Sequence, residues 1–179
     1  MLRLAPVALF PPIDEPPERV RAVLAPLRND FSVAVVGAGN AFAVGAIIRV
    51  AHSFLAREVL VVGNEPYYAK ASMGMEKYET IVRLPDEAAF WDHVHGRPVW
   101  ALEKDRARRS IYDVRAFAGN VVLVFGSERA GLSPEMVDRA DDVLAIPIYG
   151  VNHSLPVAVA AGIAMHEWAR RRYAGASKE

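Results

Sequence analysis

The sequence has no cysteine and no uninterrupted apolar run of about 18 residues. Without cysteine there can be no disulfide bond and no thiolate metal site. Without a long apolar run a transmembrane helix is not expected, and so neither is a membrane partner. The first residues soon become rich in proline and acidic, and they lack a convincing signal-peptide cleavage site. We therefore expect a cytoplasmic location.

Several ligand-binding motifs are also missing. There is no Gly-Lys-Ser/Thr phosphate loop and no Gly-x-Ser-x-Gly nucleophile elbow. Gly37-Ala38-Gly39 follows an apolar stretch like a dinucleotide fingerprint, but Phe42 stands where the third glycine belongs. His93 and His95 lie near the end of an expected surface helix, where solvation is the simplest interpretation. We expect neither NAD nor a metal ion as a cofactor.

Composition indicates one globular domain. The chain has 179 residues, 53% of them hydrophobic and 23% charged, which is enough to bury a core. The formal net charge is zero, whereas nucleic-acid-binding domains are usually basic. Most basic residues are nevertheless arginines, clustered at 106–109 and 170–172, and a neutral total can conceal a basic face. GC-rich coding would also enrich arginine, so that alternative stays open.

Apolar strands alternate with helices along the chain, a pattern typical of a parallel sheet covered on both faces. The fold class is therefore α/β. We expect an N-terminal arm and helix over residues 1–30 and a single domain over 31–175. Apolar runs predict strands at 32–36, 58–62, 80–83, 98–102, 120–125 and 143–146. Periodicity predicts helices at 17–28, 43–55, 67–75, 87–95, 134–139 and 155–173.

Three segments carry the most specific signal. VVLVFGSERAG (121–131) is a strand that ends in a glycine loop, GAIIR (45–49) places an arginine in an apolar helix, and IPIYG (146–150) precedes Ser154-Leu155. In their order along the chain, 45–49, 121–131 and 146–150, these segments resemble the SpoU/TrmH-type RNA ribose methyltransferases of the SPOUT superfamily. The resemblance covers about Val33 to Arg172. The resemblance implies a Rossmann-like sheet with a C-terminal deep trefoil knot. It also implies a homodimer whose active site draws on both subunits.

The same resemblance implies an activity. The protein is expected to be a methyltransferase that uses S-adenosylmethionine to methylate a ribose 2′-hydroxyl of tRNA or rRNA. Three loops are expected to hold the cofactor. Their residues are Phe125, Gly126, Ser127, Glu128, Gly131, Ile146, Ile148, Gly150, Ser154 and Leu155.

The catalytic candidates implied by the resemblance are Arg49, Glu128 and Ser154. A guanidinium stays protonated near neutral pH, so Arg49 would polarise the ribose hydroxyl or hold a phosphate. Each residue also has a structural interpretation. Arg49 could form an ion pair with Glu128, Glu128 could cap or brace its loop, and Ser154 could be the N-cap of the last helix.

Two positions depart from the family pattern. Ala43 stands six residues before Arg49, and Pro156 follows Ser154-Leu155, where relatives usually have asparagine. Neither side chain forms hydrogen bonds. The alternative function is therefore a catalytically impaired RNA-binding or assembly protein with the same fold. We hypothesise that Asn152 and His153 supply the missing polar contacts.

The last helix is rich in small residues, which suits close packing against a second subunit or within one core. A dimer would place Arg170 to Arg172 near its edge, within reach of RNA phosphates. The roughly 30 residues before the first strand are too few for a separate RNA-binding domain. Substrate choice is then expected to depend on the catalytic domain, the arm and residues 67–115.

Overall fold

A computed structural model describes residues 15–64 and 66–173 of the chain. Most of the expected arm, residues 1–14, and the last two residues of the expected domain, 174–175, lie outside these ranges. Within the described ranges, no helix is both long enough and apolar enough to cross a membrane.

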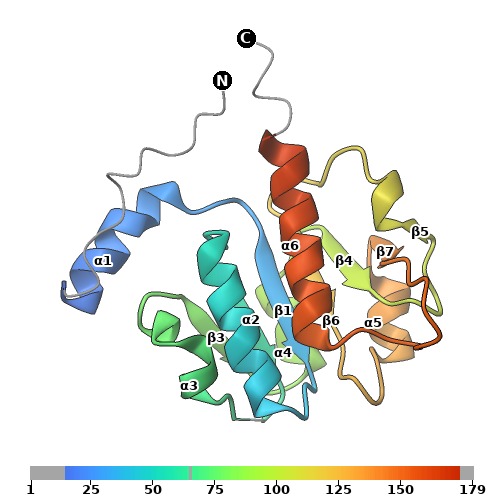
Figure 1. Cartoon of the computed structure of the whole chain (residues 1–179), viewed down its shortest axis with the longest axis horizontal. Helices are drawn as coiled ribbons and strands as arrows, with labels where there is room; N and C mark the ends of the chain where they lie inside the picture. The colour runs from blue at the N-terminus through green and yellow to red at the C-terminus, as the bar shows by residue number, and fades with distance from the viewer. Residues whose placement is uncertain (1–14, 65, 174–179) are drawn as a thin grey trace.

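The centre of the molecule is a seven-stranded sheet in which all pairings are parallel. Its order is β3-β2-β1-β6-β4-β7-β5, so the late strand β6 lies between β1 and β4 (Figure 1). All carboxyl ends therefore meet at one edge, where parallel α/β sheets bind ligands. The strands are β1 (Ser32–Val36), β2 (Val59–Val62), β3 (Ile81–Leu84), β4 (Val99–Leu102), β5 (Arg109–Ser110), β6 (Val122–Phe125) and β7 (Asp142–Ala145).

Helices cover both faces of the sheet (Figure 1). On one face, α2 and α6 pack over one buried cluster, and on the other α4 and α5 pack over a second. The remaining helices, α1 and α3, lie beside α2 at one side of the sheet. The helices are α1 (Pro17–Leu24), α2 (Ala41–Ser53), α3 (Ala69–Ser72), α4 (Glu87–His93), α5 (Pro134–Arg139) and α6 (Val157–Tyr173).

The predicted parallel α/β fold is confirmed, and each predicted helix and strand is present with bounds shifted by a few residues. The sequence prediction missed β5, a two-residue strand of polar side chains. It has no apolar run or alternation that could reveal it, and it forms because Arg109 and Ser110 pair with Leu144 and Ala145 of β7.

A polar cluster lies at the opposite, amino edge of the sheet. Glu58 forms an ion pair with Arg97 (2.6 Å) and accepts a hydrogen bond from the buried Ser32 hydroxyl (3.0 Å). The ring of His93 lies 3.1 Å from the other Glu58 oxygen. The expectation that His93 is merely solvated is therefore wrong, because α4 ends against the start of β2. No group of three metal-ligating side chains is found in the part of the chain that the structure describes.

Candidate functional site

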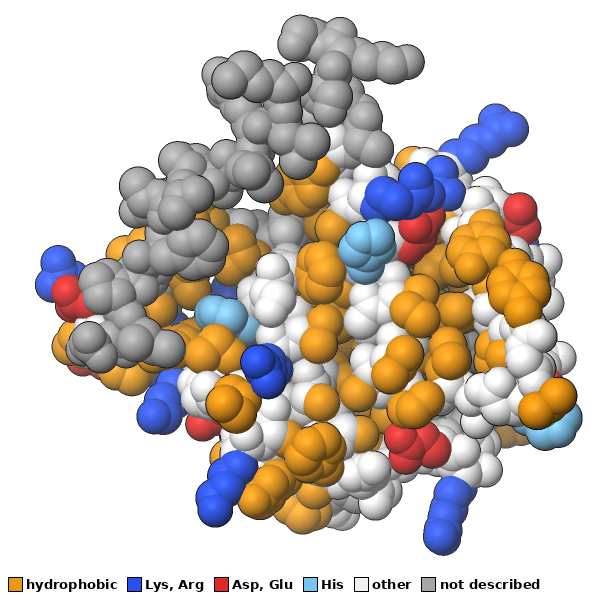
Figure 2. Space-filling view, in the orientation of Figure 1, with side chains coloured by type: hydrophobic (Ala, Val, Ile, Leu, Met, Phe, Trp, Pro, Cys, Tyr) orange, Lys and Arg blue, Asp and Glu red, His pale blue; other side chains and the backbone are white. Residues whose placement is uncertain are grey.

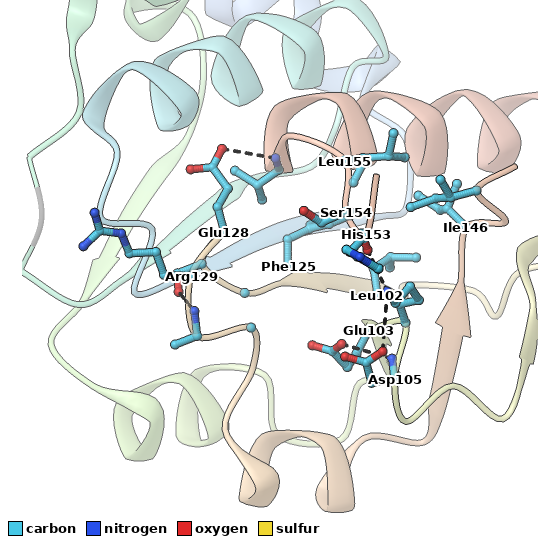
Figure 3. Close-up of a pocket in the computed structure, with 18 of the residues that line it drawn as sticks. Leu102, Glu103, Asp105, Phe125, Glu128, Arg129, Ile146, His153, Ser154 and Leu155 are labelled. Atoms are coloured by element: carbon cyan, nitrogen blue, oxygen red, sulfur yellow. Dashed lines mark hydrogen bonds and ion pairs between the residues drawn. The ribbon is translucent and has the colours of Figure 1, made fainter. Parts of the chain in front are cut away.

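A cavity of about 370 Å³ lies at the carboxyl ends of β4, β6 and β7 (Figure 3). It is lined by the loops that follow these strands and by the segment leading into α6. Its volume falls within the range of small-molecule sites. The lining residues predicted from the sequence are Phe125, Gly126, Ser127, Glu128, Gly131, Ile146, Ile148, Ser154 and Leu155.

The loop after β6 is compact because of its two glycines. A Cβ on Gly126 would lie 2.2 Å from the carbonyl carbon of Gly131, so no side chain fits there. Gly131 has a φ of +64°, a left-handed conformation that favours glycine. The Gly131 N–H donates to the Ser127 carbonyl at 2.9 Å, and the Ala130 N–H donates to the Ser127 hydroxyl at 3.0 Å. The loop is thus closed on itself and exposes its backbone to the cavity.

Glu128 points from this loop toward the first turn of α6 (Figure 3). Its Oε1 accepts a hydrogen bond from the Val157 N–H at 3.4 Å. This contact matches the structural interpretation of Glu128 as a capping residue. Among residues 15–64 and 66–173 the second carboxylate oxygen has no hydrogen-bond donor, so it can accept from a ligand.

Ser154 lines the cavity but does not cap α6. The helix begins at Val157, and the Pro156 carbonyl accepts hydrogen bonds from the N–H groups of Val159 and Ala160. The interpretation of Ser154 as an N-cap is therefore wrong, because the helix begins too far along the chain. The Asn152 side chain donates to the Ser154 carbonyl at 3.1 Å and braces the segment.

Arg49 and Gly150 do not line this cavity. Arg49 lies on the exposed side of α2, away from the buried Ile47, Ile48 and Ala51. It forms no ion pair with any described residue, so the suggested pair between Arg49 and Glu128 is wrong for the single chain. Gly150 is exposed in the loop after β7.

The sequence prediction missed three residues at the end of β4: Glu103, Lys104 and Asp105. Glu103 accepts hydrogen bonds from the backbone N–H groups of Asp105 (3.3 Å) and Leu132 (3.4 Å). Lys104 donates to the His153 carbonyl at 2.7 Å and so joins two sides of the cavity. They directly follow a predicted strand, but the sequence does not indicate that this strand lies beside β6 and β7.

The lining combines two kinds of surface. Apolar side chains from β4, β6, β7 and the α6 segment form one part, namely Leu102, Phe125, Leu144, Ile146, Ile148 and Leu155. Carboxylates from Glu103, Asp105 and Glu128 lie around the rest, together with the basic side chains of Lys104 and Arg129 (Figure 3). Such a site suits a ligand that combines a flat apolar ring with hydroxyl and charged groups of both signs.

A sequence model described as the SpoU rRNA Methylase family matches residues 30–166. One relative, the 23S rRNA (guanosine-2′-O-)-methyltransferase RlmB of Coxiella burnetii, is 30% identical over 137 residues, which is 74% of this chain and 55% of that protein. The chain spans about half the length of such curated relatives.

Two solved structures have the same architecture. The A. aeolicus TrmH/SpoU tRNA modifying enzyme superposes with a TM-score of 0.78 at 26% identity, covering 89% of this chain and 84% of that one. The SpoU methyltransferase AviRb from Streptomyces viridochromogenes, in complex with the cofactor AdoMet, gives 0.72 at 27% identity, covering 83% and 60%.

Proposed function

The chain belongs to the SpoU rRNA Methylase family, and we propose that it is an S-adenosylmethionine-dependent RNA 2′-O-ribose methyltransferase acting on tRNA or rRNA. The observation that carries this proposal is the cavity at the carboxyl edge. Three segments that the sequence analysis assigned to the cofactor line it: the loop after β6, the loop after β7 and the Ser154-Leu155 segment. The names of the relatives support the same activity.

The cavity has the chemistry that S-adenosylmethionine requires. Its apolar side chains suit the adenine ring, backbone groups exposed at Gly126 and Gly131 suit the adenine edge, and carboxylates suit hydroxyl groups and positive charge. When bound, the cofactor supplies an electrophilic methyl group on a sulfonium. We propose that Phe125, Gly126, Ser127, Glu128, Gly131, Ile146, Ile148, Ser154 and Leu155 hold it, whereas Gly150 lies outside the cavity of its own chain.

The proposed roles of the catalytic residues follow from their chemistry. The Glu128 oxygen that does not bond Val157 can accept a hydrogen bond from the ribose. The Ser154 hydroxyl lies in the cavity wall and can position the same ribose. Arg49 can polarise the hydroxyl or hold the adjacent phosphate, but its guanidinium is too basic to remove a proton.

The exposure of Arg49 supports a shared active site. Arg49 lies outside the cavity of its own chain and has no ion-pair partner among residues 15–64 and 66–173. We therefore propose a homodimer in which Arg49 serves the cavity of the other subunit. Val159 on α6 is 47% exposed and offers an apolar contact for a second copy.

The finer features of the family belong to the same proposal. They are the trefoil knot in the C-terminal part, the division into residues 1–30 and the domain 31–175, and a cytoplasmic location. The position of the late strand β6 between β1 and β4 is compatible with such a knot.

The first test is calorimetric titration with S-adenosylmethionine, followed by methyl transfer from labelled cofactor to bulk tRNA and rRNA. Nuclease digestion and mass spectrometry should then detect a 2′-O-methylated nucleoside. Absence of cofactor binding at millimolar concentration would instead favour a non-catalytic RNA-binding protein.

The second test concerns Arg49. Arg49→Ala should lower methyl transfer at least about 100-fold, as loss of a transition-state contact does, without changing the melting temperature. Arg21→Ala, an exposed change on α1, is the matched control. Mixing Arg49→Ala subunits with Gly126→Ala subunits should restore part of the activity, since a mixed dimer holds one intact site. Mixtures with no recovery would contradict the shared site.

A further inference from the structure

Phe42 and Tyr68 form an exposed pair of aromatic rings outside the cavity. Their centroids are 6.3 Å apart with an interplanar angle of 27°, and the residues are 61% and 46% exposed. Aromatic side chains of this size usually contribute to cores or interfaces. Two in contact on the surface therefore point to a binding surface.

The backbone around both rings is held firmly. Asn40 caps α2, and its Oδ1 accepts hydrogen bonds from the N–H groups of Phe42 (3.1 Å) and Ala43 (3.3 Å). The Tyr68 N–H donates to the Ala41 carbonyl at 2.8 Å. A Cβ on Gly45 would lie 2.4 Å from the Tyr68 carbonyl oxygen, so only glycine allows this approach. The pair is thus preformed and loses little freedom when it binds.

The pair lies at the same edge of the sheet as the cavity. Phe42 follows the end of β1, and Glu128 follows the end of β6, the strand paired with β1 through Val35 and Phe125. Phe42 and Arg49 are seven residues apart on α2, which places them on one face about 10 Å apart along the axis. Figure 2 shows hydrophobic side chains gathered at this end of α2, with basic side chains beside them.

Two cations flank the rings. Arg49 and Lys70 are both exposed, and neither forms an ion pair within the described ranges. Binding sites for single-stranded nucleic acid combine exposed aromatic rings with unpaired cations. Bases stack on the rings and phosphates contact the cations. An apolar protein partner would leave both charges unsatisfied.

We propose that Phe42 and Tyr68 form a stacking platform for an unpaired base of the RNA substrate, close to the nucleotide that is methylated. This inference rests on the proposed function, because it assigns the surface beside Arg49 to the same RNA. Base stacking tolerates any base, so the platform selects unpaired structure near the target ribose and does not select a sequence.

The test measures binding of a fluorescent single-stranded ten-nucleotide oligoadenylate by anisotropy, with an abasic strand of equal length for comparison. Phe42→Ala and Tyr68→Ala should each weaken oligoadenylate binding about tenfold, the effect of one lost stacking contact. Phe42→Trp should retain affinity, and binding of the abasic strand should not change. Tyr112→Ala, which removes another exposed ring (55% exposed), is the matched control.

Two results would overturn the platform. One is equal or undetectable binding of oligoadenylate by the wild type and Phe42→Ala. The other is dissociation of a dimer by Phe42→Ala in sedimentation, because the rings would then face a second copy. Calorimetry of the wild type with S-adenosylmethionine separates the two proposals. Normal cofactor binding with unaltered RNA binding in Phe42→Ala removes the platform alone, whereas absent cofactor binding removes the methyltransferase.

Discussion

The carboxylate of Glu128 and the backbone N–H of Val157 join the loop after β6 to the first turn of α6. The Val157 N–H is one of the helix N-terminal donors that lack a partner within the helix. A negative charge at this position also interacts favourably with the helix dipole. Glu128 therefore organises the cavity wall, whatever it contributes to chemistry.

Substitutions of Glu128 should separate these two contributions. Glu128→Ala removes the acceptor and should lower the free energy of unfolding by about 1 kcal/mol, as loss of an N-cap does. Glu128→Gln keeps an acceptor oxygen and should retain most of that stability. Urea denaturation and methyl transfer should be measured on both variants. Wild-type stability in Glu128→Ala would rule out the capping role, whereas inactive but stable Glu128→Gln would show that catalysis needs the charge.

Gly126→Ala should disrupt the cofactor loop. The new Cβ would lie 2.2 Å from the Gly131 carbonyl carbon and 2.5 Å from the Leu132 nitrogen, both backbone atoms that cannot rotate away. We expect the dissociation constant for S-adenosylmethionine to rise at least about tenfold, or ~1.4 kcal/mol, in calorimetry. Gly119→Ala is the control, because its Cβ would meet only Asp30 Oδ2 at 3.6 Å. Equal affinities in the two variants would mean that the loop adapts.

The sequence was sufficient to predict the strands and most of the cavity. An apolar run that stops at Gly126 marks the carboxyl end of a buried strand, and parallel strands bring such ends together. The sequence alone did not reveal Glu103 and Asp105, because they reach the cavity only through the pairing of β4 with β6 and β7. Strand order arises from long-range packing, which local periodicity does not encode.

Side-chain partners were harder to predict than elements. The apolar neighbours of Arg49 in the sequence suggested that its charge needs an ion-pair partner. In the structure Arg49 lies on the exposed side of α2, where solvent reaches its charge. Likewise, serine is a residue type favoured at N-caps, but Ser154 does not cap α6 because that helix begins at Val157. A shift of two or three residues in a helix start changes which side chain reaches the free N–H groups.

Glu58 should make stability depend on acidity. Burial raises the pKa of this carboxyl, but hydrogen bonds from Arg97, His93 and Ser32 and the charge of Arg97 outweigh burial and lower it. A lowered pKa contributes stability above the unfolded-state value of about 4.5, and that contribution is lost as the pH falls through the folded-state pKa. The free energy of unfolding, measured in urea, should therefore decline below about pH 4.5.

Glu58→Gln provides the comparison for this pH dependence. It leaves the guanidinium of Arg97 without its anionic partner, so we expect a loss of about 3 kcal/mol near neutral pH. Its stability should fall less steeply in acid than that of the wild type. Some slope should remain, because hydrogen bonds from Arg170 and Arg171 also lower the pKa of Glu167 despite its partial burial. Parallel curves for wild type and Glu58→Gln would contradict the assignment.

The arginines at the end of α6 should differ in their contribution to RNA binding. Arg170 and Arg171 both bond Glu167, whereas Arg172 is exposed and has no ion-pair partner in the described part of the chain. A cation already paired within the protein releases fewer counterions when it meets a phosphate. Arg172→Ala should therefore reduce the slope of log affinity for tRNA against log salt by about 1, and Arg170→Ala by less. Binding should be measured across a KCl series.

Two outcomes would contradict this prediction. A flat salt response in the wild type would mean that these arginines do not contact phosphates. A larger effect at Arg170 than at Arg172 would mean that RNA displaces Glu167 from Arg170.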